Sequence, residues 1–90
     1  MKDIYDISFY KIMNNIEEVL ENSEYKYLSF VIEDDDVHIR KIIRLDRIAS
    51  IETYREKKRD GMGGDCLRIC IERYDEINIR QHDLKSIIIY

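Results

Sequence analysis

The chain has 90 residues, is 44% hydrophobic and 38% charged, and contains seventeen isoleucines, seven tyrosines and no proline. This length supports one domain with a single core, and the composition excludes a disordered chain. β-Branched and aromatic residues fit the pleated surface of a sheet, so the composition favours strands.

The net charge of −4 is unevenly distributed along the chain. Residues 1–36 hold ten acids and three bases, whereas residues 37–90 hold nine acids and twelve bases. A molecule with separated charge can orient a charged partner or pair with a second copy of itself.

The first predicted element is an amphipathic helix at about residues 8–22. Its apolar side chains recur at steps of three and four, which is typical of a helix with one buried face. These side chains are Phe9, Ile12, Met13, Ile16, Val19 and Leu20. Asp6 or Ser8 can cap the start by accepting from free backbone N–H groups.

Residues 27–51 and 66–87 carry one pattern twice: a strand, a polar turn, a strand, a turn led by Asp46 or Asp83, and a strand. The pattern predicts strands at about 26–33, from 37, and at 48–56, and again at 66–73, 76–80 and 86–90. At Arg40-Lys41 the alternation slips into the adjacent pair Ile42-Ile43, which predicts a bulge.

These elements predict an α+β fold, with the N-terminal helix followed by a six-stranded antiparallel meander of two three-stranded repeats. Short connections favour the meander, and a bulge would curl it into a curved sheet or small barrel; a flat sheet is the alternative. We expect one domain, 1–90, with a first β-repeat at 26–56, a basic glycine-rich linker loop at 57–65 and a second β-repeat at 66–90.

The linker loop is the first candidate binding site, because exposed cations and glycine N–H groups can receive phosphates. Its candidate residues are Arg55, Lys57, Lys58, Arg59, Gly61, Gly63 and Gly64. A solvated loop is the alternative, since no phosphate-loop or dinucleotide motif is present. Basic side chains elsewhere that could assist are Arg40, Lys41, Arg44 and Arg80.

A second candidate surface is acidic and could mimic phosphates to a basic partner. Its residues are Glu17, Glu18, Glu21, Asp34, Asp35 and Asp36. The calcium-loop spacing is missing, so we predict no metal and no cofactor.

The C-terminal strand is the third candidate, because it is apolar on both faces at what should be a sheet edge. We expect it to mediate a homo-oligomer through Ile87, Ile88, Ile89 and Tyr90, together with Cys70. Closure of the sheet within one chain is the alternative.

No pairing of nucleophile, base and acid is visible, so we predict a protein without enzymatic activity. The leading hypothesis is a small protein-binding module, such as an inhibitor or an immunity or anti-defence protein. The abundance of isoleucine, lysine and tyrosine suits an AT-rich bacterial or phage genome. The alternative is a nucleic-acid or nucleotide binder. Short apolar runs, the lack of a signal-peptide core and two unbridged cysteines predict a cytoplasmic protein away from membranes.

Overall fold

One helix and seven strands make up the regular structure of the described residues. The computed structural model describes residues 1–22, 24–57, 64–73 and 75–90. The elements in chain order are β1 (Lys2–Asp3), α1 (Phe9–Leu20), β2 (Tyr27–Asp34), β3 (Val37–Arg44), the 3-10 turn η1 (Leu45–Arg47), β4 (Ile48–Arg55), β5 (Asp65–Ile71), β6 (Asp75–Arg80) and β7 (Leu84–Ile89). The predicted helix and six main strands are therefore present, with ends within two residues of those expected.

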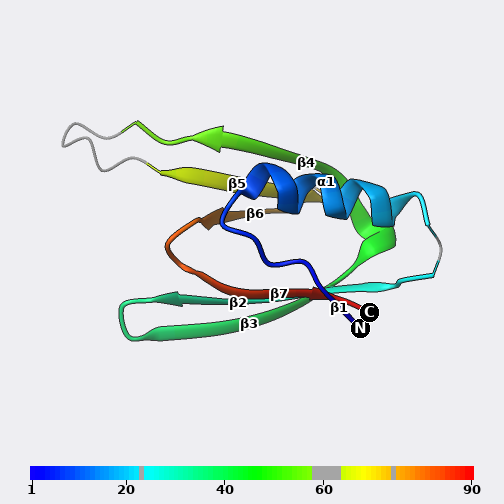
Figure 1. Ribbon diagram of the computed structural model, residues 1–90, viewed down its shortest axis with the longest axis horizontal. Helices are drawn as coiled ribbons and strands as arrows, with labels where there is room; N and C mark the ends of the chain where they lie inside the picture. The colour runs from blue at the N-terminus through cyan, green and yellow to red at the C-terminus, as the bar shows by residue number, and fades with distance from the viewer. Residues whose placement is uncertain (23, 58–63, 74) are drawn as a thin grey trace.

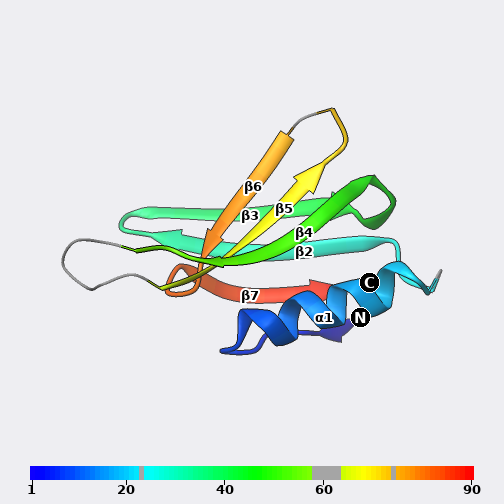
Figure 2. The ribbon, with the colours of Figure 1, turned by 90° about the horizontal axis from the view of Figure 1, so that it is seen from above.

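The strands form two antiparallel sheets, which we call sheet A and sheet B. Sheet A has the order β1-β7-β2-β3, and sheet B has the order β4-β5-β6. Figures 1 and 2 show two layers, with sheet A on one side and sheet B and α1 next to each other on the other. The strands of sheet B cross those of sheet A at an angle (Figure 2).

The core lies between the two layers and is built from the inward side of each strand's alternation. Leu28, Phe30, Ile87 and Ile89 come from sheet A and are at most 1% exposed. Sheet B supplies Leu67, Ile69 and Ile79, and α1 supplies Phe9, Ile12, Ile16 and Val19. The side chain of Ser8 caps α1 by accepting from the N–H of Lys11 at 3.4 Å.

The predicted α+β class and antiparallel pairing are confirmed, but the strands do not close into a barrel. The hydrogen-bonded order is interrupted between β3 and β4 and between β6 and β7, so the six strands do not run as one meander. At both places a short turn, η1 or residues 81–83, carries the chain from one sheet to the other. This transfer buries the apolar faces of both sheets against each other.

The predicted bulge at Arg40-Lys41 is wrong. β2 and β3 pair without a shift from Tyr27–Arg44 to Asp34–Val37. The alternation is intact because Ile43 is buried whereas Ile42 is 52% exposed on the opposite face. The registers shift instead between Val31 and Ile32 in the β2–β7 ladder, and between Ile48 and Ser50 in the β4–β5 ladder.

We expect Phe30→Ala to lower the free energy of unfolding by about 3–5 kcal/mol, because it leaves a cavity in the buried face of β2. Val37→Ala is the control, since Val37 is 54% exposed and truncation of an exposed side chain costs within about 0.5 kcal/mol. Denaturant unfolding followed by circular dichroism measures both. Equal losses in the two variants would contradict the two-layer core.

The β2–β3 turn contains a residue in the left-handed region, Asp35, with φ of 49°. We expect Asp35→Gly to raise the free energy of unfolding by up to about 1 kcal/mol, because glycine adopts positive φ without a steric cost. Asp36→Gly, at a position with ordinary φ, should lower it because glycine adds only unfolded-state entropy there. Thermal unfolding of the two variants tests this difference in sign.

Candidate functional site

The outer face of sheet B is polar and largely occupied by its own interactions. Arg68 on β5 lies at its centre and donates to Glu52 Oε1 at 2.7 Å and to Asn78 Oδ1 at 3.1 Å. Its guanidinium carbon lies 4.6 Å from the centre of the Tyr54 ring, a cation–π contact. A face whose charged groups are already paired has little left to offer a ligand.

Arg68, Glu52, Asn78 and Tyr54 form what we call the Arg68 cluster, and its contacts shift the pKa values of Tyr54 and Arg68. Burial raises the pKa of Tyr54, and the neighbouring Cys66 raises it further, whereas the cation of Arg68 acts in the opposite direction. The hydrogen bond to Glu52 raises the pKa of Arg68. The cluster therefore keeps a neutral phenol beneath a permanent cation.

The outer face of sheet A has the opposite character. Its side chains alternate with the buried ones on β2, β3 and β7, and the apolar members of this outward set form a surface that we call the A face. The A face consists of Tyr27, Val31, Ile42, Ile88 and Tyr90. No described element lies over it (Figure 1).

The A face is continuous around Ser29. Ser29 pairs with Ile42 on one side and Ile88 on the other, and it is only 3% exposed although it is on the outer side. The backbone N–H of Tyr27 donates to the carbonyl of Tyr90 at 2.7 Å, and the N–H of Tyr90 donates to the carbonyl of Tyr27 at 3.0 Å. The centroids of the two rings are 5.4 Å apart. The result is a surface of large apolar side chains with a small residue at its centre.

Cations border the A face along β3. Arg40 pairs across the strands with Val31, and Arg44 pairs with Tyr27 and forms an ion pair with Asp46 at 2.7 Å. Among the residues that the structure describes, Arg40 and Lys41 form no ion pair with an acid. β3 contains no acidic residue, so its edge carries net positive charge.

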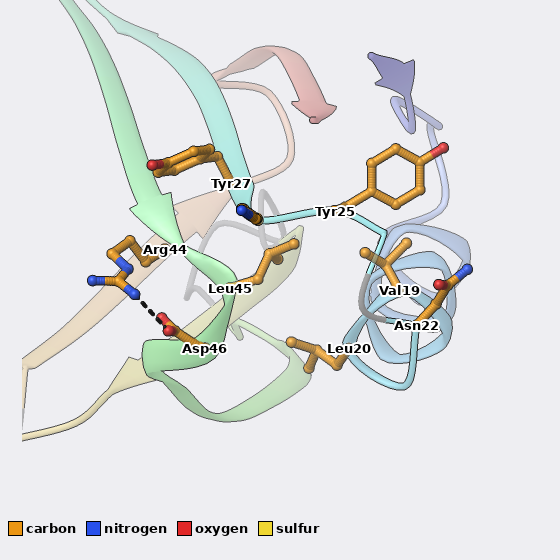
Figure 3. A pocket seen from close by; sticks show the side chains of 9 residues that line it. Val19, Leu20, Asn22, Tyr25, Tyr27, Arg44, Leu45 and Asp46 are labelled. Atoms are coloured by element: carbon orange, nitrogen blue, oxygen red, sulfur yellow. Dashed lines mark hydrogen bonds and ion pairs between the residues drawn. The ribbon is translucent and has the colours of Figure 1, made fainter.

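A pocket of about 520 Å³ lies at one end of the A face, where the end of α1, the start of β2 and η1 meet (Figure 3). Val19 and Leu45 are buried at its wall, and Leu20 and Tyr25 add apolar surface. Tyr27 and Arg44 line the pocket and also belong to the A face or its border, so the two features are continuous. Asn22, Lys26 and Asp46 complete the lining.

The predicted basic loop is only partly described. Lys58, Arg59, Gly61 and Gly63 lie outside the described residues. Arg55 is 3.5 Å from Asp65, and Arg80 is 3.4 Å from Glu56, so each of these two cations already faces a carboxylate. Lys57 is exposed, and the carbonyl of Gly64 accepts from the N–H of Glu56 at 3.1 Å.

The predicted acidic residues are exposed but separated. Glu17, Glu18 and Glu21 lie on and just after α1, and Asp34–Asp36 form the β2–β3 turn. Figure 1 shows the end of α1 and this turn at opposite ends of the molecule. They form two small acidic groups rather than one surface.

The C-terminal strand lies inside sheet A, between β1 and β2, and not at an edge. Ile87 and Ile89 are buried in the core of the single chain and are not accessible. Ile88 and Tyr90 remain on the A face, whereas Cys70 is on the outer face of the other sheet. The structure therefore keeps only part of this predicted group together.

Sequence reasoning did not identify Val37, Ile39 and Ile42, which are 54%, 47% and 52% exposed on β3. The signal in the sequence is the segment Val37–Arg44, which has apolar residues on both faces and no acid. Its adjacent pair Ile42-Ile43 predicts a bulge, although the strand is in fact a regular edge strand. An edge position could not be inferred, because pairing partners are set by the other strands.

Comparisons of the chain with protein families, with curated proteins and with solved structures find no match. Within the described ranges, no helix has the length and apolar character needed to cross a membrane. No cluster of three or more His, Cys, Asp or Glu side chains suited to a metal ion occurs in the same residues.

We expect Arg68→Gln to raise the pKa of Tyr54 further, because the cation favours the phenolate and its removal disfavours it. Absorbance of the phenolate during alkaline titration measures this, after subtraction of the curve for Tyr54→Phe. Arg44→Gln, on the other sheet, is the control and should leave the Tyr54 titration in place. A Tyr54 pKa that falls in Arg68→Gln would contradict the assigned contact.

Proposed function

We propose that this protein is a non-enzymatic module that binds another protein through the A face. The observation that carries the proposal is the apolar A face, on which Tyr27, Ile42 and Tyr90 are exposed and Val31 and Ile88 are half-buried. Contiguous exposed apolar patches on small proteins mark interaction sites, and tyrosine is enriched in protein interfaces. Covering such a surface stabilises a complex because the apolar side chains leave water.

The contrast between the two sheets supports this choice of face. On sheet B, Arg68 is engaged by Glu52, Asn78 and Tyr54. On sheet A, Ile42 is 52% exposed, and no described element lies over that side of the sheet (Figure 1). Because the two sheets are of similar size, the difference reflects the side chains that each presents.

The border of the A face indicates the chemistry of the partner. Arg40, on the outer side of β3 beside Val31, has no acidic partner among the described residues, so a binding surface with a carboxylate at its edge would complement it. The adjoining pocket, walled by Leu45 and Val19, suits one anchoring side chain of that surface. Masking a partner's own surface in this way is what an inhibitor or immunity protein does, and we include that role, in the cytoplasm, in the proposal.

We expect Ile42→Asp to weaken binding of the partner at least tenfold, about 1.4 kcal/mol, because a charge replaces apolar surface at the centre of contact. The side chain is exposed, so the fold should persist. Ser50→Asp, which adds the same charge to the exposed outer side of sheet B, is the matched control. Photo-crosslinking from position 42 identifies the partner, and calorimetry with the purified partner measures both variants.

Equal affinity of Ile42→Asp and the parent protein would overturn the proposal. Recovery of nucleic acid instead, with binding that falls steeply as salt is added, would also overturn it, since phosphate contacts release counterions. Binding that weakens only slightly as salt is added, and that is lost in Ile42→Asp but retained in Ser50→Asp, supports it.

We also propose that residues 27–51 and 66–87 are two copies of one β unit. Two pairs of equivalent backbone hydrogen bonds support this. The N–H of Glu33 donates to the carbonyl of Asp83, and the N–H of Glu72, 39 residues later, donates to the carbonyl of Arg47, 36 residues before Asp83. In the same way, the N–H of Leu45 donates to Lys26, and the N–H of Gln81, 36 residues later, donates to Asp65, 39 residues after Lys26. Each unit thereby gives two strands to one sheet and its third strand to the other.

A further inference from the structure

The outer edge of β3 has backbone groups that no other described strand bonds. Tyr27 and Tyr90 bond each other, and the N–H of Glu33 donates to Asp83, so the odd-numbered residues of β2 face β7. The even-numbered ones therefore face β3, where their partners are Val37, Ile39, Lys41 and Ile43. The residues between them, His38, Arg40 and Ile42, direct their N–H and C=O groups away from the sheet.

The side chains of this edge are also available. Seven of the eight residues of β3 are exposed, and only Ile43 is buried. Val37 and Ile39 lie on the inner side of sheet A, beyond the part that the second layer covers, because each pairs with an even-numbered residue of β2. A long edge with free backbone groups and exposed aliphatic side chains is a template for another strand.

We infer that the occupant of this edge is β3 of a second copy, paired antiparallel about a two-fold axis at Ile39. The charges on β3 select this register, because like charges directly opposite each other are destabilising. An axis at Arg40 or Lys41 places that cation against itself, and an axis at Ile42 places Arg40 against Arg44 of the second copy. An axis at Arg44 also places that cation against itself, and axes at His38 and Ile43 overlap only residues 37–39 and 42–44 of the strand.

With the axis at Ile39, residues 37–41 of the two copies overlap. In this register the one pair of basic residues opposite each other is His38 and Arg40. The ring of His38 is 2.9 Å from the carboxylate of Glu33, so the incoming Arg40 meets a carboxylate there. Lys41 of the second copy lies opposite Val37, next to the turn carboxylates Asp35 and Asp36. The basic half of each strand thus runs beside the acidic turn of the other.

The same geometry buries the exposed inner side of β3. Ile39 packs against Ile39 of the second copy, and Val37 packs against the aliphatic part of Lys41. The two-fold axis is perpendicular to the sheet, because residues facing each other across an antiparallel pair lie on one side. The two A faces therefore join into one surface across the axis.

Light scattering measures the dimer directly. We expect the protein at micromolar concentration to have twice the mass of the 10.9 kDa chain. Arg40→Pro removes an outward N–H that β2 does not use, so it should weaken the dimer at least tenfold. Asn78→Pro, at an outward-facing position on the β6 edge, is the matched control and should remain dimeric.

Crosslinking tests the register and does not depend on the proline variant. In the inferred dimer, residues 39 of the two copies form a non-hydrogen-bonded pair with Cα atoms about 4.5 Å apart, which a disulfide can span. Residues 41 of the two copies are separated by more than roughly 13 Å along the strands. Ile39→Cys should therefore form a disulfide-linked dimer on mild oxidation at least ten times faster than Lys41→Cys or the parent protein.

A parent protein that is monomeric throughout the micromolar range would overturn the inference and leave an acidic segment of another protein as the occupant. A dimer that crosslinks through position 41 would overturn the register. Neither result bears on the proposed function, since a monomer that binds its partner through Ile42 retains it. Unchanged partner binding in Ile42→Asp, in a protein that stays dimeric, would overturn the proposed function and leave the dimer in place.

Discussion

The pairing of β2 with β7 is the contact on which the rest of the structure depends. These strands are far apart in the chain, and their ladder places Leu28 and Phe30 beside Ile89 and Ile87 on one buried face. Closing such a long loop costs conformational entropy, which the burial of four large side chains offsets. Because β7 joins sheet A, the chain that leaves β3 must return to it, and β4, β5 and β6 are held above as the second layer.

This arrangement also determines which surfaces remain open. Sheet B and α1 cover the inner side of β2 and β7, whereas β3 lies at the far edge and keeps Val37 and Ile39 exposed. The outer sides of both sheets face water, but at the centre of sheet B lies the charged side chain of Arg68, whereas the centre of sheet A carries apolar side chains around Ser29. The apolar A face and the free edge of β3 are adjacent, so one strand contributes to both proposed contacts.

Several features were readable from local pattern because they depend on neighbours within a few residues. The stripe from Phe9 to Leu20 predicted α1, and the alternation around Phe30 and Ile69 predicted β2 and β5 with the correct buried sides. The error at Arg40-Lys41 came from treating every isoleucine as buried. Ile42 is an apolar residue on the outer face of an edge strand, and the alternation there is regular.

The sequence by itself determined the helix, the six main strands, the inward side of β2 and β5 and the uneven distribution of charge, because periodicity and composition are properties of short segments. Only the tertiary structure decided that β7 is an inner strand, that β3 is an edge, that Ile88 is outside while Ile87 and Ile89 are inside, and that the acidic groups lie apart. The reason is physical: the sheet to which a strand belongs depends on which distant strands bury its apolar face, and that competition involves the whole chain.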